Sequence, residues 1–312
     1  MSKRTLFFSS PAYLSLRNHQ LVWKIPEIEK DDTLTEEQKA AAERTFPIED
    51  IGIVVLDNRR LTLTHGLMDA LLASNCAIVT CDQRSMPVGL FLPLASHSLQ
   101  QERFEAQIGA SLPLKKQLWQ QTMRAKIGNQ ASALHLATQA ETGCLRAWAR
   151  EVRSGDPDNL EGRAAVYYWK NLFANHIGAF RRDRMGPPPN NLLNYAYAIL
   201  RSCIARALTC HGLLPTLGIH HHNRYNAYCL ADDVMEPYRP YADLIVRDIV
   251  TTTPEALDEL TRATKAKLLS VVSVQVCIDG QNTELQTAAL QTAASLAKCF
   301  LGETDKLVYP KL

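Results

Sequence analysis

Residues 190–210 read NNLLNYAYAILRSCIARALTC, a run without glycine or proline in which apolar side chains recur at helical spacing. The run follows Pro187–Pro189, which end the preceding segment, and it starts with Asn190, a favourable N-cap residue. We therefore predict a long helix over residues 191–210. Similar runs occupy most of the chain after Pro93, and they predict further helices over residues 114–140, 143–152, 160–175, 225–249, 254–269 and 283–301.

The chain before Pro93 has a different pattern. Short apolar runs at residues 5–8, 21–24, 51–56 and 77–81 are separated by turn residues, which is typical of strands. Residues 31–44 predict a short helix or a loop, and residues 67–74 predict a further helical turn. The sequence thus predicts an α+β protein, with a small β-rich, sandwich-like domain over residues 1–93 and a larger all-helical domain over residues 94–312.

Composition limits the class of protein. With 312 residues, of which 46% are hydrophobic and 21% charged, the chain can bury a sizeable core. No run approaches the roughly 18 to 20 apolar residues of a membrane span, so we expect no membrane anchor and no signal peptide. The eight cysteines form no CxxC pair, which favours a reducing, cytoplasmic environment. A net charge of +2 is too small to indicate nucleic-acid binding by itself, so any DNA-binding surface must be a local patch.

The densest cluster of possible metal ligands lies in residues 212–240, which read GLLPTLGIHHHNRYNAYCLADDVMEPYRP. Three histidines precede a predicted helix on which Asp233 and Glu236 project from one face, where two carboxylates can share a cation. The apolar neighbours of these carboxylates favour burial, and a buried carboxylate needs a cation or hydrogen bonds. The alternative is a polar loop followed by an ordinary solvated helix face.

A second candidate lies in residues 159–173, which read NLEGRAAVYYWKNLF. Glu161 stands in the first turn of a predicted helix, beside small residues that let another helix approach closely. Its alternative role is pairing with the helix dipole, worth about 0.3 to 1 kcal/mol. Trp169 in the same segment fits either stacking on an unpaired base or packing in the core.

Four segments in order resemble a known family. They are N-x-E followed by AA, Y and W at 159–169, NNLLNYAYAILR at 190–201, GLLPTLGIHH at 212–221 and ADDVMEPYRP at 231–240. Together they are similar to the CRISPR-associated integrases, the first of the two universal CRISPR adaptation proteins. Many members have GLDP where this chain has GLLP, so Leu214 departs from the commoner form. Residues 61–90 and 118–130 are more similar to members that accompany type II systems.

The resemblance implies a divalent ion, Mg²⁺ or Mn²⁺, whose ligands and catalytic residues would be Glu161, His221 and Glu236, with Asp233 as a possible further ligand. His221 is chosen because the family's glycine-x-x-histidine spacing places the ligand three residues after Gly218. His220 and His222 remain alternatives. Carboxylate oxygens with one imidazole suit such hard ions better than a thiolate-binding metal.

The function that the resemblance implies is spacer acquisition: a metal-dependent DNA endonuclease and strand transferase that joins the 3′-hydroxyl ends of short DNA fragments to the CRISPR repeat. Implied partners are double-stranded DNA, a second copy of the chain in a homodimer formed through the β-rich domain, the second adaptation protein and the type II effector nuclease. Two alternatives stay open. One is a metal-dependent nuclease acting on branched DNA or RNA in repair, and the other is a non-catalytic helical nucleic-acid-binding module.

DNA also has to be held along its backbone, which basic side chains do through phosphate contacts. The candidates are Arg59, Arg60 and Arg84 in the β-rich domain, and Arg163, Lys170, Arg181, Arg182 and Arg184 near the predicted metal site. For each of them the alternative is an ordinary solvated surface charge.

Overall fold

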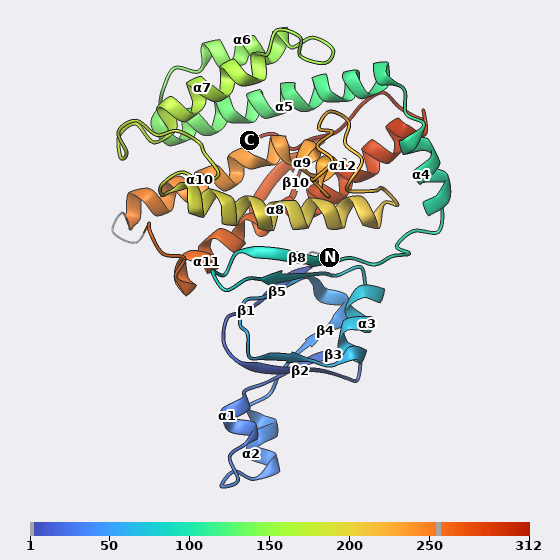
Figure 1. Ribbon diagram of the computed structural model, residues 1–312, viewed down its shortest axis with the longest axis vertical. Coiled ribbons are helices and arrows are strands. Elements are labelled where there is room, and N and C mark those ends of the chain that lie inside the picture. Colours follow the sequence, from blue (N-terminus) through green and yellow to red (C-terminus); the bar gives the residue numbers. More distant parts are fainter. Residues whose placement is uncertain (1–2, 254–256) are drawn as a thin grey trace. The chain divides into compact units, whose positions relative to one another are not determined.

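The chain forms two compact units, Met1–Ser96 and His97–Leu312, in a computed structural model that describes residues 3–253 and 257–312 (Figure 1). The first unit is rich in strands and the second in helices, which confirms the predicted fold class. The units divide after Ser96, whereas the sequence placed the boundary after residue 93.

The first unit contains two sheets of four strands within its described residues. One has the order β1-β5-β7-β8, in which β8 is antiparallel to β7 and the other neighbours are parallel. The other has the order β4-β3-β2-β6. The strands are β1 (Arg4–Phe8), β2 (Ala12–Arg17), β3 (Gln20–Lys24), β4 (Arg44–Pro47), β5 (Ile51–Leu56), β6 (Leu61–Leu63), β7 (Ala77–Cys81) and β8 (Pro87–Phe91), and the helices are α1 (Pro26–Glu29), α2 (Glu36–Ala41), η1 (Ile48–Asp50) and α3 (His65–Ala73).

Both sheets contribute to one hydrophobic core. Phe8 of β1 and Ile78 of β7 belong to it together with Leu14 of β2, and Leu71 of α3 packs into the same cluster. The four strands that the sequence predicted are present as β1, β3, β5 and β7. Their continuous apolar runs are typical of strands buried in a sheet. The strands β2, β4, β6 and β8 were not predicted, since they are short or, like β8 with its sequence PVGLF, contain residues that weaken a strand pattern.

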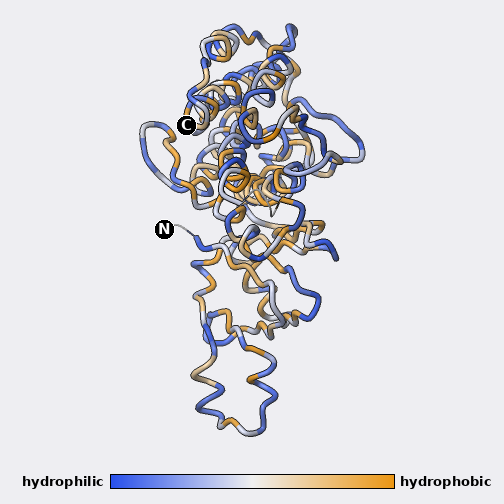
Figure 2. Tube along the Cα trace, turned by 90° about the vertical axis from the view of Figure 1, so that its left-hand side faces the viewer, coloured by the Kyte–Doolittle hydropathy of each residue, from blue (hydrophilic) through white to orange (hydrophobic). Residues whose placement is uncertain are grey.

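The second unit is built around the long helix α5 and the buried helix α8. Hydrophobic residues concentrate in the middle of this unit and hydrophilic residues in its outer loops (Figure 2). The helix α5 packs against α6, α7 and η2, and α8 packs against α9, α10 and α12. The elements are α4 (Gln100–Ile108), α5 (Leu112–Thr138), α6 (Gly143–Glu151), α7 (Leu160–Leu172), α8 (Asn190–Cys210), α9 (Cys229–Met235), η2 (Glu236–Tyr238), α10 (Arg239–Thr252), α11 (Arg262–Leu269), η4 (Ser270–Ser273) and α12 (Leu285–Phe300).

Three helix predictions need correction. The single helix predicted over residues 225–249 is divided into α9, η2 and α10, because Pro237 and Pro240 lack the N–H groups that a continuous helix requires. The predicted helix over residues 254–269 starts at Pro254, outside the described residues, and the described helix α11 begins only at Arg262. Asn190 is the first residue of α8 rather than its cap.

The sequence predicted an all-helical second unit, but this unit also contains two strands. The strands β9 (Gln275–Ile278) and β10 (Gln281–Glu284) form an antiparallel hairpin. They are joined by Asp279 and Gly280, both with positive φ, 49° and 77°, as a two-residue hairpin turn requires. This Asp-Gly pair was the sequence signal that could have predicted the hairpin. Within the part of the chain that the structure describes, no helix has the length and hydropathy to cross a membrane.

Candidate active site

Glu161 is held in the first turn of α7 by a well-defined helix start. Asn159 adopts a left-handed conformation and accepts a hydrogen bond from Gly162 N, while the Asp156 carboxylate accepts from Leu160 N at 2.9 Å and from Glu161 N at 3.0 Å. A Cβ atom at position 162 would lie 2.7 Å from Asn159 Oδ1, so a larger residue there would displace the capping side chain of Asn159. The Glu161 side chain is 32% exposed. Its backbone is therefore fixed while its carboxylate stays accessible.

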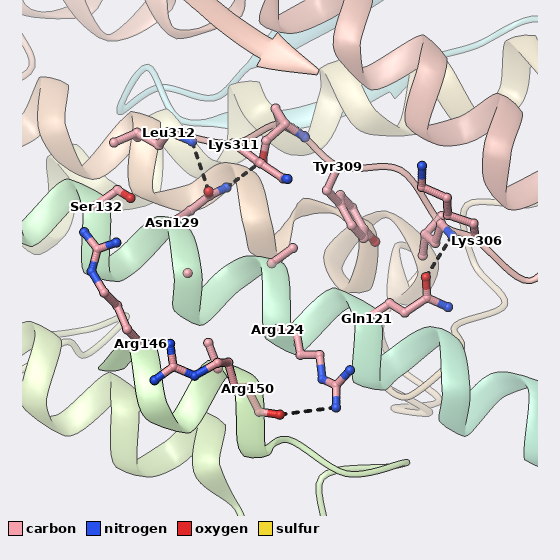
Figure 3. Close-up of a pocket in the computed structure, with 15 residues that line it drawn as sticks. Gln121, Arg124, Asn129, Ser132, Arg146, Arg150, Lys306, Tyr309, Lys311 and Leu312 are labelled. Atoms are coloured by element: carbon pink, nitrogen blue, oxygen red, sulfur yellow. Dashed lines mark hydrogen bonds between the residues drawn. The ribbon is translucent and has the colours of Figure 1, made fainter. Parts of the chain in front are cut away.

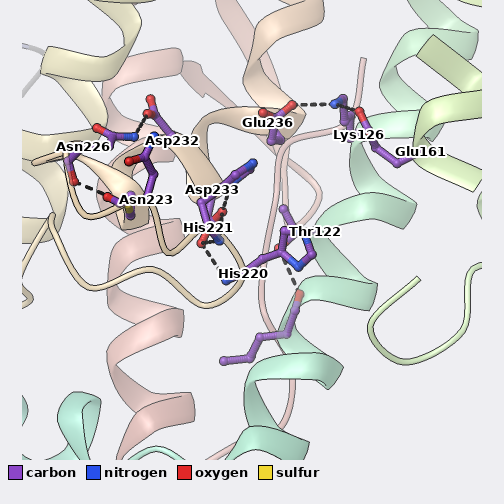
Figure 4. Close-up of polar contacts among 12 residues, drawn as sticks. Thr122, Lys126, Glu161, His220, His221, Asn223, Asn226, Asp232, Asp233 and Glu236 are labelled. Carbon is purple, nitrogen blue, oxygen red and sulfur yellow. Dashed lines mark hydrogen bonds and ion pairs between the residues drawn. The ribbon is translucent and has the colours of Figure 1, made fainter. Parts of the chain in front are cut away.

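Glu236 lies at the junction of α9 and η2 and is buried. Its Oε1 atom pairs with the Arg239 guanidinium at 2.9 Å, and its Oε2 atom lies 2.6 Å from Lys126 Nζ. The same ammonium group donates a hydrogen bond to Glu161 (Figure 4). Two predicted ligands from different parts of the chain thus converge on a single cation supplied by α5.

The charges in this cluster support one another. Burial alone would raise the pKa of Glu236, but Arg239 and Lys126 hold it below its ordinary value. Burial alone would lower the pKa of Lys126, but Glu236 and Glu161 raise it above its ordinary value. Glu236 and Lys126 are therefore both charged at neutral pH.

The buried Asp233 of α9 anchors the histidine loop. Its carboxylate accepts hydrogen bonds from His220 N at 2.9 Å and from His221 N at 3.3 Å, and it contacts His221 Nδ1. The loop approaches so closely that a Cβ atom at Gly218 would lie 2.4 Å from His221 O and 2.8 Å from Asp233 Oδ2. Both Asp233 oxygens are thus engaged by the loop, which makes Asp233 a positioning residue in this structure.

The three neighbouring histidines have different surroundings. The His220 ring stacks on Trp119, with centroids 4.0 Å apart, whereas His221 meets Trp119 edge-on at 5.7 Å. His222 is exposed. The hydrogen bond to Asp233 raises the pKa of His221, against the effect of burial, and Glu236 adds to the rise. Because a carboxylate accepts from Nδ1–H, the lone pair of neutral His221 lies on Nε2, which makes no hydrogen bond within the described residues.

The predicted metal ligands are brought close to one another but not into a common coordination sphere. Across residues 3–253 and 257–312, no group of three or more His, Cys, Asp or Glu side chains is arranged to hold a metal ion. Glu236 Oε2 is nevertheless buried and has no partner in hydrogen-bond geometry, although it pairs with Lys126. Two carboxylates beside an imidazole form a donor set for Mg²⁺ or Mn²⁺. The residues therefore fit such an ion, provided that the Lys126 ammonium withdraws.

The predicted DNA-binding residues separate into exposed and structural groups. Seven of them are exposed: Arg59, Arg60 and Arg84 in the first unit, and Arg163, Lys170, Arg181 and Arg184 in the second. Arg182 instead donates to Asn190 Oδ1 at 2.9 Å and to Asn194 Oδ1 at 2.8 Å, and its guanidinium lies over the Tyr197 ring. Its hydrogen-bonding capacity is largely used within the fold. Trp169 is partly buried and packs against Phe173 and Phe180.

A basic cavity that the sequence did not indicate lies between α5, α6 and residues 306–312 (Figure 3). Its volume is about 570 Å³, and its lining contains no aspartate or glutamate. Five cations line it: Arg124, Arg146, Arg150, Lys306 and Lys311. Arg124 is committed to the carbonyl oxygens of Val152 and Arg150, and Lys306 Nζ lies 3.8 Å from Asp279 Oδ1. Arg146, Arg150 and Lys311 therefore carry most of the available positive charge.

Sequence reasoning also missed Lys126 and Arg239. A signal for Lys126 was present, because it follows Trp119 and Met123 at helical spacing and so falls on the buried face of α5. A lysine in that position needs a negative partner. The partner itself could not be read from the pattern.

The chain combines a strand-rich N-terminal unit with a helical unit in which Glu161 and Glu236 converge on Lys126, and comparison with known proteins identifies its family. The model of the family "CRISPR associated protein Cas1" matches residues 27–271. The chain is 36% identical to the CRISPR-associated endonuclease Cas1 of Neisseria meningitidis serogroup C (strain 8013) over 307 residues, 98% of this chain and 94% of that relative. It belongs to the Cas1 family.

Solved structures share the fold. A casposase bound to integration product aligns with a TM-score of 0.77 and 19% identity, covering 98% of this chain and 92% of that chain. A chain of a Cas6-RT-Cas1–Cas2 complex aligns with a TM-score of 0.72 and 18% identity, covering 99% of this chain and 36% of that chain.

Proposed function

We propose that this Cas1-family protein is a spacer-acquisition integrase of the type II form, which joins the 3′-hydroxyl ends of short DNA fragments to a CRISPR repeat with the help of Mg²⁺ or Mn²⁺. The observation that carries the proposal is the convergence of Glu161 and Glu236 on one cation, beside His221. The endonuclease name of the Neisseria relative and the integration product bound by the casposase support it.

Glu161, His221 and Glu236 would hold the ion, and Asp233 would orient the imidazole so that Nε2 faces it, as partners of ligating histidines commonly do. When bound, a divalent ion supplies Lewis-acid stabilisation of phosphate charge during in-line displacement. Arg239 pairs with Oε1 of Glu236, the oxygen that does not face Lys126, and so keeps Glu236 ionised. Since the nucleophile is the DNA 3′-hydroxyl, no protein nucleophile is needed, which agrees with the absence of a cysteine from these contacts among the described residues.

The exposed basic residues and the basic cavity would hold DNA through its phosphates. The proposed partners are a second copy of the chain, joined through the β-rich unit, the second adaptation protein and the type II effector nuclease. The complex of a structural relative with Cas2 supports the second of these.

A strand-transfer assay tests the proposal. Short duplexes with 3′-hydroxyl or 3′-deoxy ends are incubated with a repeat-bearing plasmid and the second adaptation protein, in Mn²⁺ or in EDTA. We expect joined product only with a 3′-hydroxyl and metal, and its loss in Glu161→Gln. The matched control is Glu151→Gln, which removes an exposed carboxylate at the end of α6.

The other outcomes identify the alternatives. Cleavage without joining, lost in the same variant, would indicate a nuclease. Binding of DNA without any metal-dependent product would indicate a non-catalytic module.

A further inference from the structure

Lys126 lies at the centre of the site, although the proposed reaction gives it no role. Its ammonium group contacts the Glu161 carboxylate and lies 2.6 Å from Glu236 Oε2, and its side chain is only 10% exposed. We propose that Lys126 is the resident cation of this carboxylate pair. It holds Glu161 and Glu236 together in the metal-free protein, it competes with a divalent ion for the same oxygens, and it thereby sets the metal concentration at which the site fills. This inference rests on the proposed function.

The charge balance of the cluster explains why a cation is needed there. Glu161 and Glu236 carry two negative charges, and Lys126 and Arg239 carry two positive charges, so the cluster is neutral. Arg239 reaches only the Oε1 side of Glu236. Without Lys126, the two carboxylates would face each other with Glu236 buried and only Glu161 in contact with water, and their like charges would repel.

The same geometry makes the lysine and a divalent ion mutually exclusive. A Mg²⁺ ion binds carboxylate oxygens at about 2.0 to 2.1 Å, inside the space that the ammonium group now fills. Both cations cannot contact Glu161 and Glu236 Oε2 at once, and their positive charges also repel each other. Lysine suits a displaceable role, because its charge sits at the end of a flexible four-carbon stem.

Arg239 does not share this role. Its guanidinium pairs with the other oxygen of Glu236 and lies over the Tyr197 ring, 4.9 Å from the centroid. It can therefore remain in place when the ammonium group leaves. The displaced Lys126 would then be free to pair with a phosphate of bound DNA.

A purely structural ion pair makes a different prediction. If Lys126 only stabilised the fold, its removal would lower stability without tightening metal binding. Competition requires that removal of the lysine both destabilise the metal-free protein and raise its affinity for metal. These two measurements together distinguish the roles.

The experiment uses the full chain without DNA and measures Mn²⁺ binding by calorimetry, and thermal unfolding in EDTA and in Mn²⁺. We expect Lys126→Met to bind Mn²⁺ at least tenfold more tightly than the wild type, to unfold at a lower temperature in EDTA and to gain more stability from Mn²⁺. Lys126→Gln, also neutral, should behave in the same way if the methionine variant does not fold. The matched control is Lys116→Met on the exposed face of α5, which should match the wild type.

Glu161→Gln separates this inference from the proposed function. If Glu161→Gln binds Mn²⁺ more weakly than the wild type, the proposed metal site stands. In that case, unchanged or weaker Mn²⁺ binding in both neutral Lys126 variants overturns only the proposed competition. If Glu161→Gln leaves Mn²⁺ binding unchanged, the proposed metal site is itself wrong and the inference falls with it.

Discussion

Neutralising Glu161 or Glu236 should have the same effect on catalysis but very different effects on stability. Glu236→Gln and Glu161→Gln each remove one predicted metal ligand, so we expect both to abolish strand joining. Glu236 is buried between Lys126 and Arg239, whereas Glu161 is one-third exposed and pairs with Lys126 alone. The two variants therefore separate the cost of an uncompensated buried charge from the loss of a ligand.

The magnitudes follow from these environments. Removing one partner of a buried ion pair costs about 3 to 5 kcal/mol, because the remaining charges stay buried without compensation. At the partly exposed Glu161, water can replace the lost partner and Lys126 keeps its contact with Glu236, so we expect less than about 1 kcal/mol. In a domain of this size 1 kcal/mol shifts Tm by about 2 to 4 °C. We therefore expect Glu236→Gln to lower Tm by about 10 °C and Glu161→Gln by less than about 4 °C.

Calorimetry in EDTA measures both shifts without interference from bound metal. Circular dichroism at 20 °C checks that each variant is folded before activity is compared. Equal shifts in Tm, or a larger shift for Glu161→Gln, would refute the assignment of Glu236 as the buried member of the pair.

Three further predictions concern other parts of the second unit. Burial raises the pKa of Asp243 to about 7. The stability that its protonated form contributes is therefore fully present below about pH 4 and is lost as the pH rises through about 7. Urea unfolding should show this loss, at most about 4 kcal/mol, in the wild type and not in Asp243→Asn. Arg181→Ala should weaken DNA binding without changing Tm, whereas Arg182→Ala should lower Tm, since Arg182 bonds two asparagines within the fold. Arg146→Ala should reduce the salt slope of DNA affinity by about 1, and an unchanged slope would remove the basic cavity from the DNA path.

The spacing of apolar residues predicted which helices form better than it predicted where one helix ends and the next begins. The period of the apolar residues identified α5, α7, α8 and α12, because each of them buries residues that recur at helical spacing. The pattern over residues 225–249 stayed helical through Pro237 and Pro240, and only the structure showed three elements there. That division places Glu236 at a helix junction rather than on a continuous helix face.

The resemblance of the four motifs to a known family nominated Glu161, His221 and Glu236, whereas residue type and spacing alone indicated a carboxylate pair at Asp233 and Glu236 and left three histidines open. Tertiary structure alone decided what surrounds them: Asp233 holds the histidine loop, and Lys126 reaches both carboxylates from α5. These contacts join segments that are distant in the chain. They depend on how α5 packs against α7 and η2, and no local periodicity encodes that packing.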